Sequence, residues 1–189
     1  MAELEDLSGP FNPDLKFEDF SKDFLLKLMK IWQWAWLHAA RAWYEAIEER
    51  FGPDAANECE LAAWLTIGER VNPRYAKVAN IESNTVLDSL KALQLPLDNT
   101  VGRLFPAKFD IKSPNHVILT FSDCPALSAL ERSAPERIKP MCHILEKLAL
   151  EKYLLNPNIK VTPLKLPPLP PQRRSPGEIA CQWEFKLEA

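Results

Sequence analysis

Two of the four cysteines lie where a protein chain can tune the reactivity of a thiol. Cys124 immediately precedes Pro125, and Cys142 lies two residues after Pro140. Proline is favoured at the first position of a helix, so both cysteines are predicted at helix N-termini. Unpaired backbone N–H groups and the helix dipole at such positions favour the thiolate, which is the reactive form of cysteine.

The third cysteine opens the segment CQWEFKL, residues 181–187, in which apolar and polar side chains alternate strictly. Alternation of this kind predicts a half-buried strand, because successive side chains leave opposite faces of a sheet. Cys181 then belongs to the buried face with Trp183 and Phe185. If that face meets the two helix ends, Cys124, Cys142 and Cys181 converge.

Three sulfur ligands and a histidine would suit zinc, so Cys124, Cys142 and Cys181 are candidate metal ligands. The alternative is that they fill space, since free cysteine is among the most buried residue types. No two cysteines have the CxxC spacing. Adjacent helical side chains diverge by about 100°, so Cys142 and His143 are poorly placed to hold one ion. Cys59 lies among alanines and is expected to pack.

His38 and Cys142 are the catalytic candidates. His38 lies in the tryptophan-rich segment IWQWAWLHAARAWY, residues 31–44, and Glu45 follows it seven residues on, close to the same helical face. A buried histidine beside a carboxylate can act as a general base. A hydrogen-bonded core or interface histidine is the alternative.

Four of the six tryptophans fall between positions 32 and 43. Such aromatic surface can wall a pocket for a small molecule, or form a core or a dimer seam. The predicted ligand-binding residues are Trp36, Trp43, Cys124, Cys142, His143 and Cys181. The sequence contains no GxSxG, no phosphate-binding glycine loop and no HExxH, so none of these motifs identifies a reaction.

Composition limits the partners and the compartment. The 189 residues carry 23 basic and 26 acidic side chains, a net charge of −3, so no basic surface for nucleic acid is expected. The most apolar run, residues 31–44, is shorter than the roughly 20 residues of a membrane span. The acidic start of the chain does not resemble a signal peptide. The sequence predicts a cytoplasmic protein with reduced thiols.

The spacing of apolar residues, which predicts the elements that position these side chains, changes along the chain. Residues 1–16 are predicted to be a flexible arm, followed by helices over 17–50, 54–69 and from Asn72-Pro73 to about 93. Strands are predicted over 101–111, 116–121, 158–166 and 178–187, with helices at 125–132 and 140–155. We therefore expect one α+β domain, 17–189, with a helical half, 17–95, packed on a small antiparallel four-stranded sheet, 96–189.

The segments WLHAARAWYEAIEERFGPDAANECELAAW, PMCH and CQWEF together resemble a bacterial family labelled only as cytosolic protein. That family is distantly similar to the L-2-amino-thiazoline-4-carboxylate hydrolase family and to vinyl-reductase-like domains. The resemblance covers residues 20–189 and implies a ligand-binding α+β architecture, commonly dimeric. Its matching positions here are His38, Trp43, Cys124, Cys142 and Cys181. Ala39, Pro163 and Leu166 stand where family members often have an aspartate and two cysteines.

Three hypotheses follow. The first is a small-molecule-binding domain, with hydrolase-like activity as an extension. The second is an assembly protein, a homodimer that buries Trp34 or Trp36. The third is a cysteine-based site for a metal such as zinc.

Overall fold

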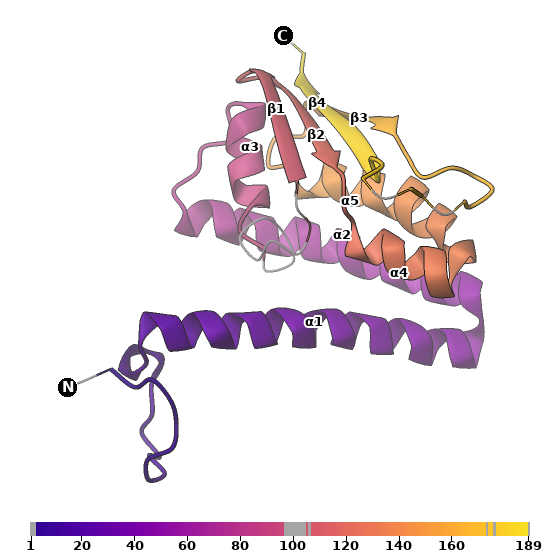
Figure 1. The fold of residues 1–189 in the computed structure, drawn as a ribbon. Coiled ribbons are helices and arrows are strands. Elements are labelled where there is room, and N and C mark those ends of the chain that lie inside the picture. Colours follow the sequence, from indigo (N-terminus) through magenta and orange to yellow (C-terminus); the bar gives the residue numbers. More distant parts are fainter. Residues whose placement is uncertain (1–2, 97–104, 106, 173, 176, 189) are drawn as a thin grey trace. The chain divides into compact units, whose positions relative to one another are not determined.

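The computed structural model describes residues 3–96, 105, 107–172, 174–175 and 177–188. The chain forms two compact units, Met1–Trp43 and Tyr44–Ala189. The first unit holds the N-terminal segment and most of the first long helix, and the second holds the remaining helices and the sheet (Figure 1). Within the described residues, no helix is long and apolar enough to cross a membrane.

The N-terminal segment folds back on the start of the first long helix. Leu4 forms a parallel bridge with Phe20, in which the backbone N–H of Leu4 donates to the carbonyl of Asp19 at 2.7 Å. A single 3₁₀ turn, η1 (Phe17–Asp19), separates this segment from helix α1 (Lys22–Phe51). The predicted helix over 17–50 therefore begins later, because the chain is extended at Phe20.

Helix α2 (Pro53–Val78) follows after a sharp turn at Gly52, whose φ of 87° favours glycine. The prediction that Asn72-Pro73 begins a new helix is wrong, since α2 runs through both residues. The buried Asn72 side chain donates from Nδ2 to the carbonyl of Tyr153. Asn72 therefore ties α2 to the end of another helix, instead of starting one.

Four antiparallel strands form one sheet in the order β1-β2-β4-β3. They are β1 (Ala107–Ser113), β2 (His116–Phe121), β3 (Ile159–Lys165) and β4 (Cys181–Leu187). Each prediction overlaps its strand, although residues 101–104 and 106 of the first lie outside the described part. Pro163 is tolerated because β3 is an edge strand.

Short helices complete the second unit. They are α3 (Val86–Leu93), α4 (Pro125–Ser133), the 3₁₀ turn η2 (Pro135–Arg137), the π-helical segment η3 (Lys139–Leu145) and α5 (Glu146–Tyr153). Figure 1 shows α3 and α5 on one side of the sheet. The α+β class and the antiparallel four-stranded sheet are confirmed.

The main core lies between the sheet and these two helices. Val86 and Leu90 of α3 and Leu150 of α5 pack against Trp183 and Phe185 of β4. Both aromatic side chains are fully buried, whereas Lys186 between Phe185 and Leu187 is exposed. The predicted alternation of β4 is confirmed, and Cys181 stands half-buried at its first position.

Candidate functional site

The structure brings the three predicted cysteines together at one end of the sheet. Cys124 is the N-cap of α4, Cys142 lies in η3 and Cys181 begins β4. The first two pack against a second core cluster formed by Leu127, Leu130, Ile138 and Ala180. Negative charge at Cys124 or at Cys181 would raise the pKa of Cys142, so the three sulfurs lie within electrostatic reach of one another. The convergence inferred from the helix ends and the strand pattern is therefore present.

The sulfurs of Cys124 and Cys181 each accept a local hydrogen bond. The backbone N–H of Leu127 donates to Sγ of Cys124 at 3.4 Å, which caps the first turn of α4. The indole Nε1 of Trp183 donates to Sγ of Cys181 at 3.3 Å. Trp183 is fully buried in the main core, so this hydrogen bond holds the sulfur of Cys181 against that core.

Desolvation raises the pKa of all three thiols, so it disfavours the thiolate that the predicted helix positions of Cys124 and Cys142 would favour. Desolvation is the main reason that the pKa of Cys124 and of Cys142 lies above the ordinary 9.0. It also raises the pKa of Cys181 to about 12. The nearby Glu146 carboxylate raises all three pKa values further, and the Arg174 guanidinium only partly opposes this rise. Two N–H groups at one helix end are too weak to offset the loss of water.

A metal site does not emerge from this grouping. Over the described ranges, no group of three or more His, Cys, Asp or Glu side chains is arranged to hold a metal ion. His143 is engaged elsewhere, because its Nε2 donates to the carbonyl of Pro167 at 2.9 Å. That hydrogen bond ties η3 to the connection between β3 and β4.

His38 is an exposed residue of α1, so the expectation of a buried base is wrong. Its Nδ1 is 2.9 Å from the carbonyl of Trp34, and the two rings lie 3.9 Å apart. Trp36 and Trp43 are also exposed, at 42% and 73%, and so they do not form the wall of an enclosed pocket. Cys59, predicted to pack, is exposed on α2.

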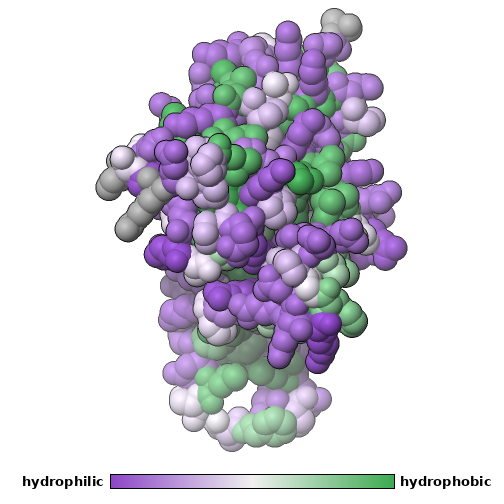
Figure 2. Space-filling model, turned by 90° about the vertical axis from the view of Figure 1, so that its right-hand side faces the viewer, coloured by the Kyte–Doolittle hydropathy of each residue, from purple (hydrophilic) through white to green (hydrophobic). Residues whose placement is uncertain are grey.

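A polar groove opens beside the thiols. Its volume is about 430 Å³, and its wall is formed by α4, the segment before it and the β3–β4 connection. The lining residues are Ser122, Asp123, Ser128, Glu131, Arg132, Arg174, Ser175 and Gly177. The side of the second unit that carries α4 is mostly hydrophilic, with hydrophobic side chains in separate patches (Figure 2).

Arg174 organises this groove. Its Nε donates to Oε1 of Glu131 at 2.8 Å, and both side chains are only 9% exposed. Its two terminal nitrogens donate to Oγ of Ser128 at 3.3 Å and to the carbonyl of Glu178 at 3.2 Å. One guanidinium thereby joins α4 to the connection that leads into β4.

Sequence reasoning missed Arg174, Glu131 and Ser128. Arg174 belongs to the only basic pair of a proline-rich connector, so its charge stood out, but its partner is 43 positions away. The i, i+3 spacing of Ser128 and Glu131 does place them on one face of a helix. Only the tertiary structure carries the connector across that face.

Comparison with known proteins gives one match. The model of DUF6125, a family of unknown function, matches residues 18–187. No curated protein and no solved structure matches the chain. The matched region includes all three cysteines of the buried group and the whole groove.

Proposed function

The chain belongs to the DUF6125 family, and we propose that it binds a small polar molecule in the groove between α4 and the β3–β4 connection. The observation that supports this most is Arg174. A nearly buried guanidinium held by Glu131, Ser128 and a backbone carbonyl gives the groove a fixed polar base. Ligand sites commonly combine a cavity of a few hundred Å³ with a few convergent polar groups of this kind.

The charges around the groove favour a ligand with a carboxylate or a similar anion. Arg174 is already paired with Glu131, whereas Arg132 on the next position of α4 is exposed at the rim. Arg132, with the hydroxyl groups of Ser128 and Ser175, can donate to an anion in the groove. Asp123 on the same wall would accept from an amino or hydroxyl group of that molecule.

The buried thiols fit a structural role behind this groove. A protonated thiol is a weak nucleophile, so Cys142 does not suit covalent catalysis at neutral pH. Cys124 instead caps α4, the helix that presents Ser128, Glu131 and Arg132. The proposed function is therefore binding, and neither the thiols nor His38 is assigned a catalytic step.

Two small carboxylates and their amides test the proposal. Succinate and benzoate are titrated while backbone NMR shifts are followed, with succinamide and benzamide as uncharged controls. We expect the carboxylates, but not the amides, to shift signals of Ser128 and Ser175. Arg132→Ala should weaken carboxylate binding at least 10-fold, as loss of a charge-assisted hydrogen bond of about 1.5–3 kcal/mol implies.

Lys147→Ala is the matched control, because Lys147 is an exposed cation of the same unit that does not line the groove. Its affinity for carboxylates should equal that of the wild type. Shifts spread evenly over exposed lysines and arginines, or an unchanged affinity in Arg132→Ala, would rule out the proposed site.

Assembly with a second copy of the chain is the second candidate function. The exposed tryptophans of α1 favour it, since large apolar surfaces on soluble domains usually mark contacts. Sedimentation velocity tests this function directly. A species of twice the chain mass is expected, and a single species of chain mass at high micromolar concentration would exclude it.

A further inference from the structure

Helix α1 carries a row of apolar residues with alternating steps of four and three. The row, called the seam below, consists of Leu25, Met29, Trp32, Trp36, Ala39, Trp43 and Ala46. This spacing has the 3.5-residue period that keeps one face of a helix turned toward a partner helix over its whole length. A helix that packs only on its own domain needs no such strict period.

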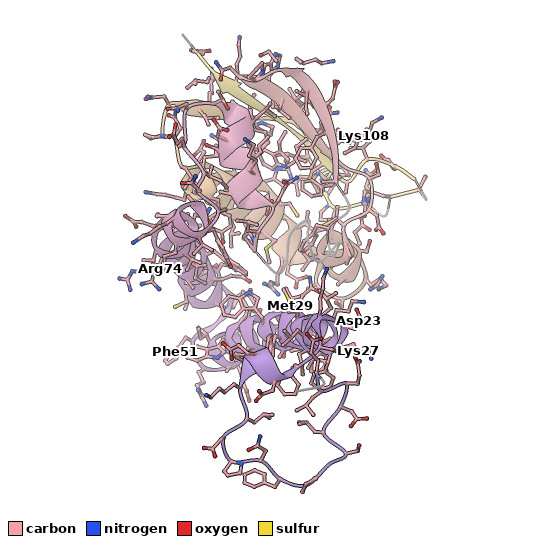
Figure 3. The ribbon with its side chains drawn as sticks, turned by 90° about the vertical axis from the view of Figure 1, so that its left-hand side faces the viewer. Asp23, Lys27, Met29, Phe51, Arg74 and Lys108 are labelled. Carbon is pink, nitrogen blue, oxygen red and sulfur yellow. The ribbon has the colours of Figure 1, made fainter. Side chains whose placement is uncertain are left out.

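The seam is accessible in the structure. Trp32, Trp36 and Trp43 are 42%, 42% and 73% exposed. Most charged residues of α1, including Asp23, Lys27 and Glu45, fall on the opposite side of the helix at 100° per residue. Figure 3 shows Met29 of the seam on a different side of α1 from Asp23 and Lys27. The exposed apolar face is therefore distinct from the solvated one.

The side-chain sizes along this face complement each other when two copies run antiparallel. When a two-fold axis passes beside Ala39, a residue n positions before Ala39 in one copy lies opposite the residue n positions after Ala39 in the other copy. Each seam tryptophan then lies level with an alanine of the partner, two of which, Ala35 and Ala42, flank the seam, whereas Met29 lies level with Glu49. The pairs are Trp43 with Ala35, Trp36 with Ala42 and Trp32 with Ala46. Alternating large and small residues is how packed helices fill the space between them.

The charges of α1 also favour the antiparallel direction. Lysines predominate in its first half, at positions 22, 27 and 30, and glutamates in its second half, at positions 45, 48 and 49. An antiparallel pair sets each basic half beside an acidic half, and it opposes the two helix dipoles favourably. Parallel pairing would align like charges.

The exposed seam supplies part of the area that a stable pair buries. Since an aromatic side chain buries about 150–250 Å², covering the exposed parts of the seam tryptophans in two copies removes roughly 600 Å² from water. Leu25, Leu28, Met29 and the alanines add to this. A typical specific interface buries about 1,600 Å² in total.

From these observations we infer that two copies of the chain pair antiparallel through α1, with each seam tryptophan packed on an alanine of the partner. The inference rests on the second candidate function, assembly with another copy. It adds which face is buried, the direction of pairing and the register.

Cysteine cross-linking tests the register without removing a tryptophan. Ala35→Cys and Ala42→Cys are made separately in a Cys59→Ser background, because Cys59 is exposed. In the inferred pair, residue 35 of one copy lies beside residue 42 of the other. Two copies of residue 35 are then about 12 Å apart along the axis, and two copies of residue 42 about 9 Å apart, at 1.5 Å per residue. A disulfide needs Cα atoms within about 7 Å.

We expect mild oxidation to give a disulfide dimer when the two variants are mixed, and little from either alone. Strong cross-linking of each variant with itself would show parallel pairing and overturn the inference, while leaving the dimer intact. Dimers that cross-link in no combination would overturn the seam as their interface. A chain of monomer mass in every sample would remove both the inference and the assembly function.

A second measurement separates the face from general loss of structure. Trp36→Glu places a charge in the seam, whereas Trp34→Glu places one on the opposite side of α1. Both residues are exposed, so both variants should fold. Trp36→Glu is expected to weaken dimerisation at least 10-fold and Trp34→Glu to leave it unchanged. Equal effects of the two would contradict the inferred face.

Discussion

At the scale of single residues, burial decides the chemistry of the cysteines. Cys124 and Cys142 were expected at helix N-termini, where the thiolate gains stability. Of the two, only Cys124 occupies an N-cap, and its backbone N–H contacts do not offset desolvation. A thiol pKa above the ordinary value means that the neutral form persists at physiological pH. The group is therefore a packed joint between α4, η3 and β4.

Thiol titration of the native protein should show one fast cysteine and three slow ones. Cys59 is exposed, whereas the other three cysteines are only partly exposed and their raised pKa values keep them protonated near pH 8. Unfolding should make all four react at similar rates. The Cys59→Ser variant serves as control and should lose the fast phase alone. Four equally fast thiols in the native protein would refute the buried arrangement.

The raised pKa values also predict how stability depends on pH. A thiol whose pKa is about 12 in the folded chain and 9.0 when unfolded binds its proton more tightly in the folded state. The folded state therefore holds more protons between these values, and the free energy of unfolding falls as pH rises through this window. Denaturant unfolding at pH 8 to 10.5 measures the slope. In Cys181→Ala the slope should be smaller, and an unchanged slope would contradict the assignment.

The effect of Gly68→Ala on the free energy of unfolding distinguishes overpacking from helix propensity. A Cβ atom at this position of α2 would overlap the ring of Tyr153, far inside van der Waals contact. Gly68→Ala should therefore destabilise the fold by about 1–3 kcal/mol, the usual cost of overpacking. Helix propensity alone would stabilise it by about 1 kcal/mol. Chemical denaturation decides between the two, and a more stable variant would show that α2 and α5 do not approach this closely.

At the scale of elements, a partly buried ion pair joins α2 to the turn before η3. Arg137 Nη2 lies 2.9 Å from Oε2 of Glu60, and the side chains are 15% and 14% exposed. The same guanidinium stacks over the ring of Tyr44 at 3.4 Å. Burial raises the pKa of Glu60 more than the attraction of Arg137 lowers it. Removing one partner would leave the other charge partly buried and unpaired, and should therefore lower the free energy of unfolding.

Glu60→Ala should lower the free energy of unfolding by about 2–3 kcal/mol, less than the 3–5 kcal/mol of a fully buried pair because some solvent reaches it. Glu60→Gln should cost less, since its amide oxygen still accepts from Arg137. Asp110→Ala is the control, because the Asp110–Lys112 pair is about half exposed. A loss below about 1 kcal/mol is expected there. Equal losses in Glu60→Ala and Asp110→Ala would contradict the role of burial.

At the scale of the whole molecule, the apolar cores belong to the second unit. The core cluster that packs α3 and α5 on the sheet contains residues from Val86 to Phe185, and the cluster beside the thiols lies between Leu127 and Ala180. The described residues before Tyr44, 3–43, contribute to neither cluster. The first unit carries most of the exposed seam, and the second holds the proposed binding groove.

A fragment of residues 44–189 should therefore fold without the first unit. Circular dichroism should show cooperative thermal unfolding, and Cys124, Cys142 and Cys181 should remain slow to react. The fragment should also be monomeric, because most of the seam is removed. A fragment without a cooperative transition would show that the cores depend on residues 1–43, in line with the single domain, 17–189, expected from the sequence.

The sequence determined the local elements and the convergence of three cysteines. Alternation in CQWEFKL identified the buried face of β4, and prolines located the start of α4, because these signals depend only on neighbouring residues. The tertiary structure decided the rest. Asn72 followed by proline predicts the start of a helix, whereas in the fold the Asn72 side chain donates a hydrogen bond to the carbonyl of Tyr153. The thiolate prediction failed because desolvation depends on residues far apart in the chain. The pairing of Arg174 with Glu131, which forms the groove, likewise required the folded connector.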